Sequence, residues 1–310
     1  MEIEKLLINL QSDVEAFSIK ERHLDAIRAA FPGVEITSVN GRDDFLAKLP
    51  EAEWIITWIF KADWYRTAPK LKGVFTPAAG RDWAPPDPSG RVSNFYGRFH
   101  GRIMRESLLA MILFFNRRIT ESLENRHGKV WGRQVYNGCT SLFSQQVLIV
   151  GYGAIGQLTA EILKPFGTTV VGVKRDIRGF ENDPSAARVV TFDRLAEELP
   201  HADHVVLLLP SGTETEGIIT AEHFSLMKKG SHLYNLGRGS CYREEDLVNA
   251  LVSGPLAGAG LDVFAKEPLP PSSPLWELPN VLIFPHSSAI SREYLDLYFR
   301  EWIDEVREIS

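Results

Sequence analysis

The sequence is poor in cysteine and has no long apolar run, and each shortage excludes a class of protein. Its 310 residues include only 2 cysteines, Cys139 and Cys241, which lie far apart, so we expect two reduced thiols and no disulfide framework. No uninterrupted apolar segment approaches the length of a transmembrane helix. The opening stretch MEIEKLLINL carries acidic residues where a signal peptide carries basic ones. We therefore expect a cytoplasmic protein with no membrane partner.

Positive charge is also in short supply. Lysine and arginine number 34 against 40 aspartates and glutamates, which gives a net charge of -6. This balance argues against nucleic acid or an anionic membrane as the main partner, although it permits a local basic pocket. His201 and His204 enter an apolar run and are interpreted as structural, and no cluster with metal-ligand spacing is apparent. We expect no bound metal.

The sequence instead offers a regular alternation of short apolar runs and amphipathic helical patterns. Five strand-like runs precede residue 100 and seven more lie between residues 145 and 285. Strands that alternate with helices predict parallel sheets covered on both faces, and so an α/β fold. Residues 101–126 contain no internal Gly or Pro and predict one long helix between the two series. A second amphipathic helix is expected near the C-terminal end.

The stretch GYGAIG, residues 151–156, follows the apolar run QVLIV and opens a helical pattern. Gly151 permits a tight turn, Gly153 lets the backbone approach a pyrophosphate, and Gly156 lets the helix pack close to the strand. The free N–H groups at the start of such a helix bind phosphate. In this context the motif predicts a dinucleotide-binding site.

The next strand-like run, TTVVGV, leads into Lys174, Arg175 and Asp176. A carboxylate at this point accepts hydrogen bonds from the ribose of NAD and repels a 2′-phosphate, whereas cations attract the phosphate. We therefore expect NADP, with Lys174 and Arg175 holding its 2′-phosphate. The alternative is that these cations are solvated and that Asp176 holds the ribose of NAD.

Four further stretches form a set with the glycine motif: LPSGTETEGII, NLGRGSCYREEDLVNAL, AGAGLDVFAKEPLP and PNVLIFPHSS. In order and spacing they resemble the D-isomer-specific 2-hydroxyacid dehydrogenases, which include glyoxylate and hydroxypyruvate reductases. The resemblance covers nearly the whole chain. It implies a Rossmann dinucleotide-binding domain, residues 101–286, inserted in a flavodoxin-like substrate domain of residues 1–100 and 287–310. The active site is expected in the cleft between them.

The resemblance also implies roles for individual residues. Arg238 would bind the substrate carboxylate and polarise the carbonyl, and His286 would exchange a proton with the carbonyl oxygen, oriented by Glu267. The backbone at Ala79 and Gly80 would hold the substrate carboxylate together with Arg238 and His286. The cofactor-binding set comprises Gly151, Tyr152, Gly153, Ala154, Ile155, Gly156, Lys174, Arg175, Pro210 and Asp262. The sequence HSSAI departs from many relatives, which have glycine soon after the histidine.

The activity implied is reduction of a small 2-keto acid by NADPH, in a homodimer for which HGKVWGR, residues 127–133, is a plausible contact. One alternative is an NAD-dependent relative such as a short phosphoglycerate dehydrogenase. Because the sequence ends soon after its last helical pattern, we expect it to lack the C-terminal regulatory domain that many of those enzymes carry, which weighs against this alternative without excluding it, since short members exist. An alternative from another class is a nucleotide-sensing, corepressor-like binding protein. Retention of Arg238, Glu267 and His286 favours catalysis.

Overall fold

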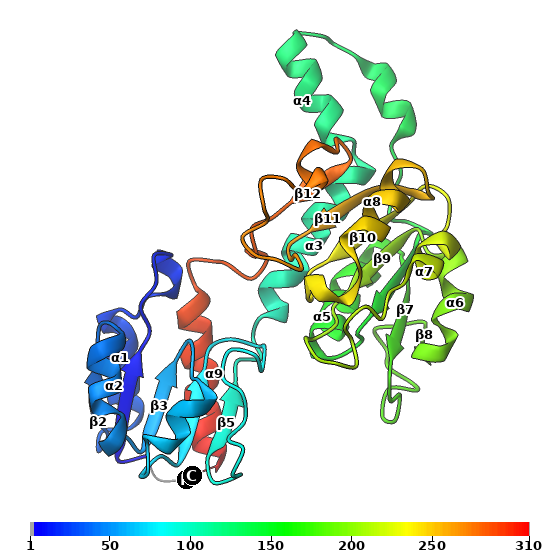
Figure 1. Ribbon diagram of the computed structural model, residues 1–310. Helices are drawn as coiled ribbons and strands as arrows, with labels where there is room; N and C mark the ends of the chain where they lie inside the picture. Colours follow the sequence, from blue (N-terminus) through cyan, green and yellow to red (C-terminus); the bar gives the residue numbers. More distant parts are fainter. Residues whose placement is uncertain (1–2, 310) are drawn as a thin grey trace. The chain divides into compact units, whose positions relative to one another are not determined.

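The computed structural model describes residues 3–309, which fold into two compact units, each with one parallel sheet (Figure 1). One unit contains the chain up to His100 together with the part from Ile290 onward, and the other comprises Gly101–Ala289. The second unit is therefore an insertion in the first. Residues 1, 2 and 310, which the expected substrate domain includes, lie outside the described residues.

The first unit is built on five strands in the order β2-β1-β3-β4-β5. The strands are β1 (Lys5–Asn9), β2 (Glu35–Ser38), β3 (Trp54–Thr57), β4 (Gly73–Thr76) and β5 (Ser93–Tyr96). The helices are α1 (Glu21–Ala30), α2 (Arg42–Lys48) and α9 (Tyr294–Ile309). The central strand β3 is buried along its whole length, as expected for a strand covered on both faces.

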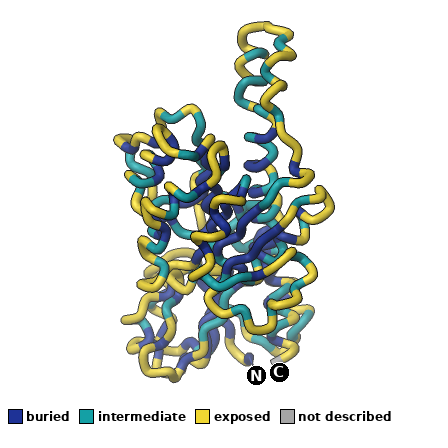
Figure 2. The backbone as a smooth tube through the Cα atoms, turned by 90° about the vertical axis from the view of Figure 1, so that its right-hand side faces the viewer, coloured by how far each residue is buried: buried dark blue, intermediate teal, exposed yellow. Residues whose placement is uncertain are grey.

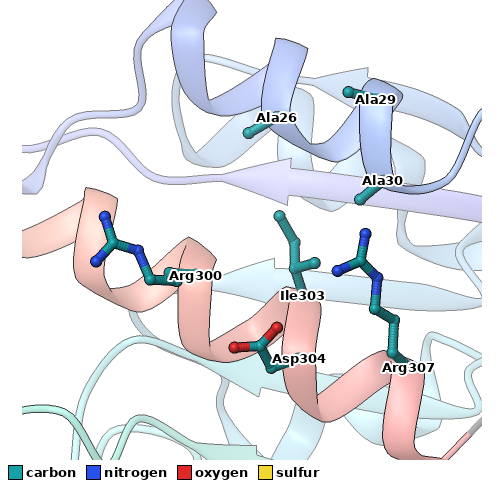
Figure 3. Close-up of a pocket in the computed structure, with 7 residues that line it drawn as sticks. All are labelled: Ala26, Ala29, Ala30, Arg300, Ile303, Asp304 and Arg307. Atoms are coloured by element: carbon teal, nitrogen blue, oxygen red, sulfur yellow. The ribbon is translucent and has the colours of Figure 1, made fainter.

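Helices α1 and α9 lie side by side, although they come from opposite ends of the chain. Arg22 Nε and Nη2 each donate to the Asp296 carboxylate at 2.8 Å, which joins the two helices at one end. Farther along, a cavity of about 290 Å³ lies between them (Figure 3). Its lining consists of Ala26, Ala29, Ala30, Arg300, Ile303, Asp304 and Arg307. None of these residues belongs to the expected active site.

The second unit contains seven strands in the order β12-β11-β10-β9-β6-β7-β8. The strands are β6 (Gln146–Val150), β7 (Thr169–Lys174), β8 (Arg188–Thr191), β9 (His204–Leu207), β10 (Ser231–Asn235), β11 (Leu256–Leu261) and β12 (Val281–Ile283). The helices are α3 (Gly101–Asn116), α4 (Ile119–Gly128), α5 (Ala154–Leu163), α6 (Leu195–Glu198), α7 (Ala221–Leu226) and α8 (Glu244–Val252). This strand order is that of a doubly wound dinucleotide-binding sheet: strands are added outward from β6 to one side as β7 and β8, and then to the other side from β9 onward.

Alternate residues of β6 face opposite sides of this sheet. Val147 and Ile149 pack with the apolar faces of α3 and α5, whereas Leu148 and Val150 pack with α6, α7 and α8. Burial on both faces requires a strand that is apolar at every position, which is why QVLIV shows no alternation. Figure 2 shows the buried strands of this sheet beside largely exposed connecting segments.

The structure confirms all twelve strand-like runs, but the single helix expected over residues 101–126 is wrong. Helix α3 ends at Asn116, Arg118 takes a left-handed conformation with φ 53°, and α4 begins at Ile119. Tertiary hydrogen bonds fix the break: Asn116 Nδ2 donates to Gln145 Oε1 at 2.9 Å, and Thr140 N donates to Asn116 O at 3.0 Å. Within residues 3–309, no helix is both long and apolar enough to cross a membrane.

Candidate active site

The glycine turn joins β6 to α5 in the conformation that the motif predicts. Gly151 has φ 98°, and a Cβ there would lie 2.7 Å from the backbone of Leu208, so both the conformation and the space require glycine. At Gly153 a Cβ would meet nothing within 4 Å, so the backbone at the start of α5 faces open space. Helix α5 thus presents its N-terminal N–H groups beside an open approach, which suits a pyrophosphate.

Tyr152 lies within the turn, and only its backbone can face the expected cofactor site. Its side chain is fully buried, and a Cβ at Gly172 on β7 would lie 2.5 Å from its ring. The ring therefore packs over β7, in contact with the glycine, and points into the core. The side chain of Tyr152 is therefore directed away from the expected cofactor site.

The charged residues at the end of β7 each have a partner. Lys174 Nζ lies 4.0 Å from the centroid of the Phe180 ring, a cation–π contact. Arg175 forms an ion pair with Glu214. The Asp176 carboxylate accepts hydrogen bonds from Arg178, which lower the pKa of Asp176. The carboxylate that could hold a ribose is thus engaged by its own neighbour in the chain.

Arg238 follows β10 on a turn held by the buried Asn235. Asn235 Oδ1 accepts from Gly237 N at 3.0 Å, and Asn235 Nδ2 donates to Arg238 O at 3.0 Å. A Cβ at Gly237 would lie 2.6 Å from Leu209 O, and a Cβ at Gly239 even closer to Phe264, so the glycines on both sides of the arginine allow close packing. The Arg238 side chain is half-buried at the carboxyl end of the sheet.

His286 and Glu267 lie side by side and form a hydrogen-bonded ion pair. His286 Nδ1 lies 2.8 Å from Glu267 Oε2, and Glu267 Oε1 accepts from Phe264 N at 2.9 Å. The hydrogen bond and charge of Glu267 raise the pKa of His286, against partial burial and the charge of Arg238. Burial works against the ionised Glu267, but its hydrogen bonds from His286 and Phe264 outweigh burial and lower its pKa. With Nδ1 directed at Glu267, Nε2 is the nitrogen available for proton exchange.

Asp262 anchors the backbone around His286. His286 N donates to Asp262 O at 2.8 Å, and Asp262 Oδ1 accepts from the backbone N–H groups of Ser287 and Ser288 at 2.6 and 3.0 Å. Ser288 Oγ donates to Asp262 Oδ2 at 2.5 Å. Burial raises the pKa of Asp262, while these hydrogen bonds act in the opposite direction. His286 itself has φ 52°, in the left-handed region.

Three predicted residues come together at the carboxyl ends of neighbouring strands. Arg238 follows β10, Asp262 follows β11 and His286 follows β12, and these strands are adjacent in the sheet. Glu267 lies in the connection from β11 to β12 and reaches His286. Ala79 and Gly80 follow β4 in the first unit, where Ala79 is exposed and Gly80 half-buried.

Sequence reasoning missed the residues that hold these side chains in place. Asn235, Phe180 and Glu214 were not singled out, because each acts through a partner distant in the sequence or through a turn. The departure HSSAI was noted without a role for its second serine. In the structure Ser288 is buried, and its hydroxyl binds Asp262.

The doubly wound sheet, its glycine turn and the open backbone at Gly153 fit a dinucleotide, and together they define a dinucleotide-binding protein. Residues 109–288 match the "D-isomer specific 2-hydroxyacid dehydrogenase, NAD binding domain". The chain belongs to the D-isomer specific 2-hydroxyacid dehydrogenase family, in agreement with the resemblance seen in the sequence.

Individual relatives support this assignment. The D-3-phosphoglycerate dehydrogenase of Mycobacterium leprae is 32% identical over 88% of this chain and 52% of its own, so the chain spans about half the length of that relative. A family protein of Aeromonas salmonicida has a similar structure, with a TM-score of 0.81, 30% identity, and coverage of 98% of this chain and 96% of that one. The NADPH-dependent glyoxylate/hydroxypyruvate reductase of Sinorhizobium meliloti, solved with NADP and sulfate, has a TM-score of 0.80 and 27% identity, over 99% and 95% of the two chains.

Proposed function

We propose that this enzyme reduces a small 2-keto acid, of the size of glyoxylate or hydroxypyruvate, to the D-2-hydroxy acid with NADPH. The observation that carries the proposal is the 2.8 Å contact between His286 and Glu267. Arg238 comes after β10, a strand of the same sheet, at the same carboxyl edge. A pair that keeps a histidine protonated suits a reaction that consumes a proton.

The residues divide the chemistry among them. The Arg238 guanidinium binds the carboxylate of the keto acid and draws electron density toward the carbonyl oxygen. His286 delivers the proton from Nε2 to that oxygen, while Glu267 stabilises the imidazolium and fixes the ring. Backbone N–H groups at Ala79 and Gly80 hold the substrate carboxylate. The bound nicotinamide supplies the hydride.

The cofactor proposal rests on the cations that follow β7. Lys174 and Arg175 lie at the carboxyl end of the strand beside the glycine turn, where they suit the 2′-phosphate of NADPH, and Asp176 is engaged by Arg178. The relative from Sinorhizobium meliloti, which was solved with NADP, agrees with this choice. Pro210 and Asp262 complete the set, from the loops after β9 and β11.

A steady-state comparison tests the proposal. NADPH and NADH are compared with glyoxylate, hydroxypyruvate, pyruvate and bulkier 2-keto acids, and we expect NADPH with the small acids to give the highest kcat/KM. His286→Gln should lower kcat by roughly 10²–10⁴ without weakening NADPH binding. Arg238→Ala should lower kcat/KM for every 2-keto acid. Near-wild-type turnover of either variant would refute the proposed mechanism.

A second candidate is oxidation of D-3-phosphoglycerate with NAD, because the relative from Mycobacterium leprae carries that name at 32% identity. The same assay distinguishes the two. Turnover of 3-phosphoglycerate with NAD that exceeds reduction of glyoxylate and hydroxypyruvate with NADPH would favour the second candidate.

We also propose a cytoplasmic homodimer formed through helix α4 and the segment after it. This segment projects from its unit (Figure 1) and exposes large apolar side chains, with Leu123 44%, Val130 57% and Trp131 87% exposed. Exposed apolar clusters of this kind mark contact surfaces between proteins. Trp131→Asp should convert the dimer to a monomer in sedimentation-velocity measurements. The two free thiols fit a reducing cytoplasm.

A further inference from the structure

The loop after β9, residues 210–217, places an acidic side chain near the proposed cofactor site. Thr215 shapes the loop: its Oγ1 donates to Pro210 O at 2.7 Å, and its backbone N donates to Gly212 O at 3.0 Å. The preceding residue, Glu214, accepts a hydrogen bond from Arg175 Nη1 and forms an ion pair with it. The two residues are 39 positions apart in the sequence, so the fold brings them together.

This ion pair joins the loops on either side of the glycine turn. In the sheet, β6 lies between β9 and β7. Glu214 follows β9 and Arg175 follows β7, whereas the turn that begins at Gly151 follows β6. The contact therefore connects the two flanking loops at the edge of the sheet where open α/β sheets bind nucleotides.

A phosphate can replace the Glu214 carboxylate as the partner of Arg175. The Arg175 and Glu214 side chains are 80% and 74% exposed, and ion pairs so exposed to water are weak. A guanidinium binds carboxylate and phosphate oxygens in the same forked geometry, so the two anions compete for it. Lys174 differs, because the Phe180 ring holds its ammonium without neutralising the charge.

We infer that Glu214 is a selectivity residue, whose carboxylate occupies Arg175 and competes with the 2′-phosphate of NADPH. This inference rests on the proposed use of Arg175 in cofactor binding. Arg175 exchanges Glu214 for the phosphate when NADPH binds, and Glu214 then lies near a second anion that repels it. Glu214 thus lowers the affinity for NADPH and leaves that for NADH unchanged.

The test measures dissociation constants by isothermal titration calorimetry, without substrate. Glu214→Gln should bind NADPH and 2′,5′-ADP about two- to fivefold more tightly than wild type, the range set by a weak exposed ion pair. Its affinities for NADH and 5′-AMP should not change. Glu216→Gln, which removes the same charge from an exposed position in the same loop, is the matched control and should resemble wild type.

A double variant shows whether the effect acts through Arg175. Arg175→Ala should weaken NADPH binding, and adding Glu214→Gln to it should then tighten binding less than Glu214→Gln does in wild type, because only the direct repulsion of the phosphate is left to relieve. If Arg175→Ala weakens NADPH binding but Glu214→Gln does not strengthen it, the inference about Glu214 is overturned. If wild type binds NADPH no better than NADH and Arg175→Ala leaves their ratio unchanged, the cofactor proposal fails instead.

Discussion

A buried histidine at the start of β9 and a half-buried histidine near the start of β10 predict that acid destabilises the dinucleotide-binding unit. His204 and His232 are directly paired neighbours in the sheet, and their rings stack with centroids 5.8 Å apart. His204 is fully buried between Tyr234 OH at 3.1 Å and Gln145 Oε1 at 3.0 Å. Burial and the charge of His232 lower the pKa of His204 to about 3, and burial lowers that of His232 to about 4.

The sign of the effect follows from these shifts. Both pKa values lie below the ordinary histidine value of 6.5, so below pH 6.5 the unfolded chain binds more protons than the folded chain. Stability is therefore fully present above pH 6.5 and is lost as the pH falls toward 4. Lowering the pH from 7.5 to 5 should cost about 2 kcal/mol for each histidine, or ~4 kcal/mol for the pair. That is a large part of the 5–15 kcal/mol typical of a folded protein.

Urea denaturation followed by circular dichroism at several pH values measures this loss. His232→Gln should remove about half of the decrease between pH 7.5 and 5. His127→Gln changes an exposed histidine of the same unit and should retain the full decrease. A free energy of unfolding that stays level over this range, or a His232→Gln protein with the wild-type pH dependence, would refute the reasoning.

Three further predictions concern the active site. Glu267→Gln removes the group that raises the pKa of His286, so kcat/KM for reduction should begin to fall at a lower pH than in wild type; an unchanged profile would contradict the pairing. Gly153→Val should keep the wild-type melting temperature, since a Cβ there meets nothing, yet weaken NADPH binding roughly tenfold or more in calorimetry. Ser288→Ala deprives the buried Asp262 of a hydrogen bond and should cost about 1–2 kcal/mol in urea denaturation, and a neutral result would show that water replaces the hydroxyl.

The sequence predicted the architecture well because the strands of this fold are marked locally. A buried parallel strand such as β6 must be apolar throughout, and the glycine turn must follow it directly, so both features are visible in a short stretch. The assignment to a Rossmann domain inserted in a second α/β domain came from the family resemblance. The contact between His286 and Glu267 was predicted for the same reason, since each residue stands in a recognisable motif.

What the sequence did not reveal depends on distant partners. The break between α3 and α4 has no glycine or proline to mark it and depends on Asn116, which binds Gln145 and Thr140 far along the chain. The pairing of Arg175 with Glu214 depends equally on the order of β9, β6 and β7. The role of Ser288 required knowing that Asp262 lies beside it.

The residue that we propose as the proton donor, His286, also has a left-handed backbone conformation. A φ of 52° is a conformation that glycine adopts without strain and that other residues adopt less often, although histidine, asparagine and aspartate are found there more often than most. Glycine at this position would relax the local backbone but would remove the imidazole that we propose as the proton donor. If the proposed mechanism holds, the ring of His286, and not the conformation of its backbone, is what requires a histidine at this position.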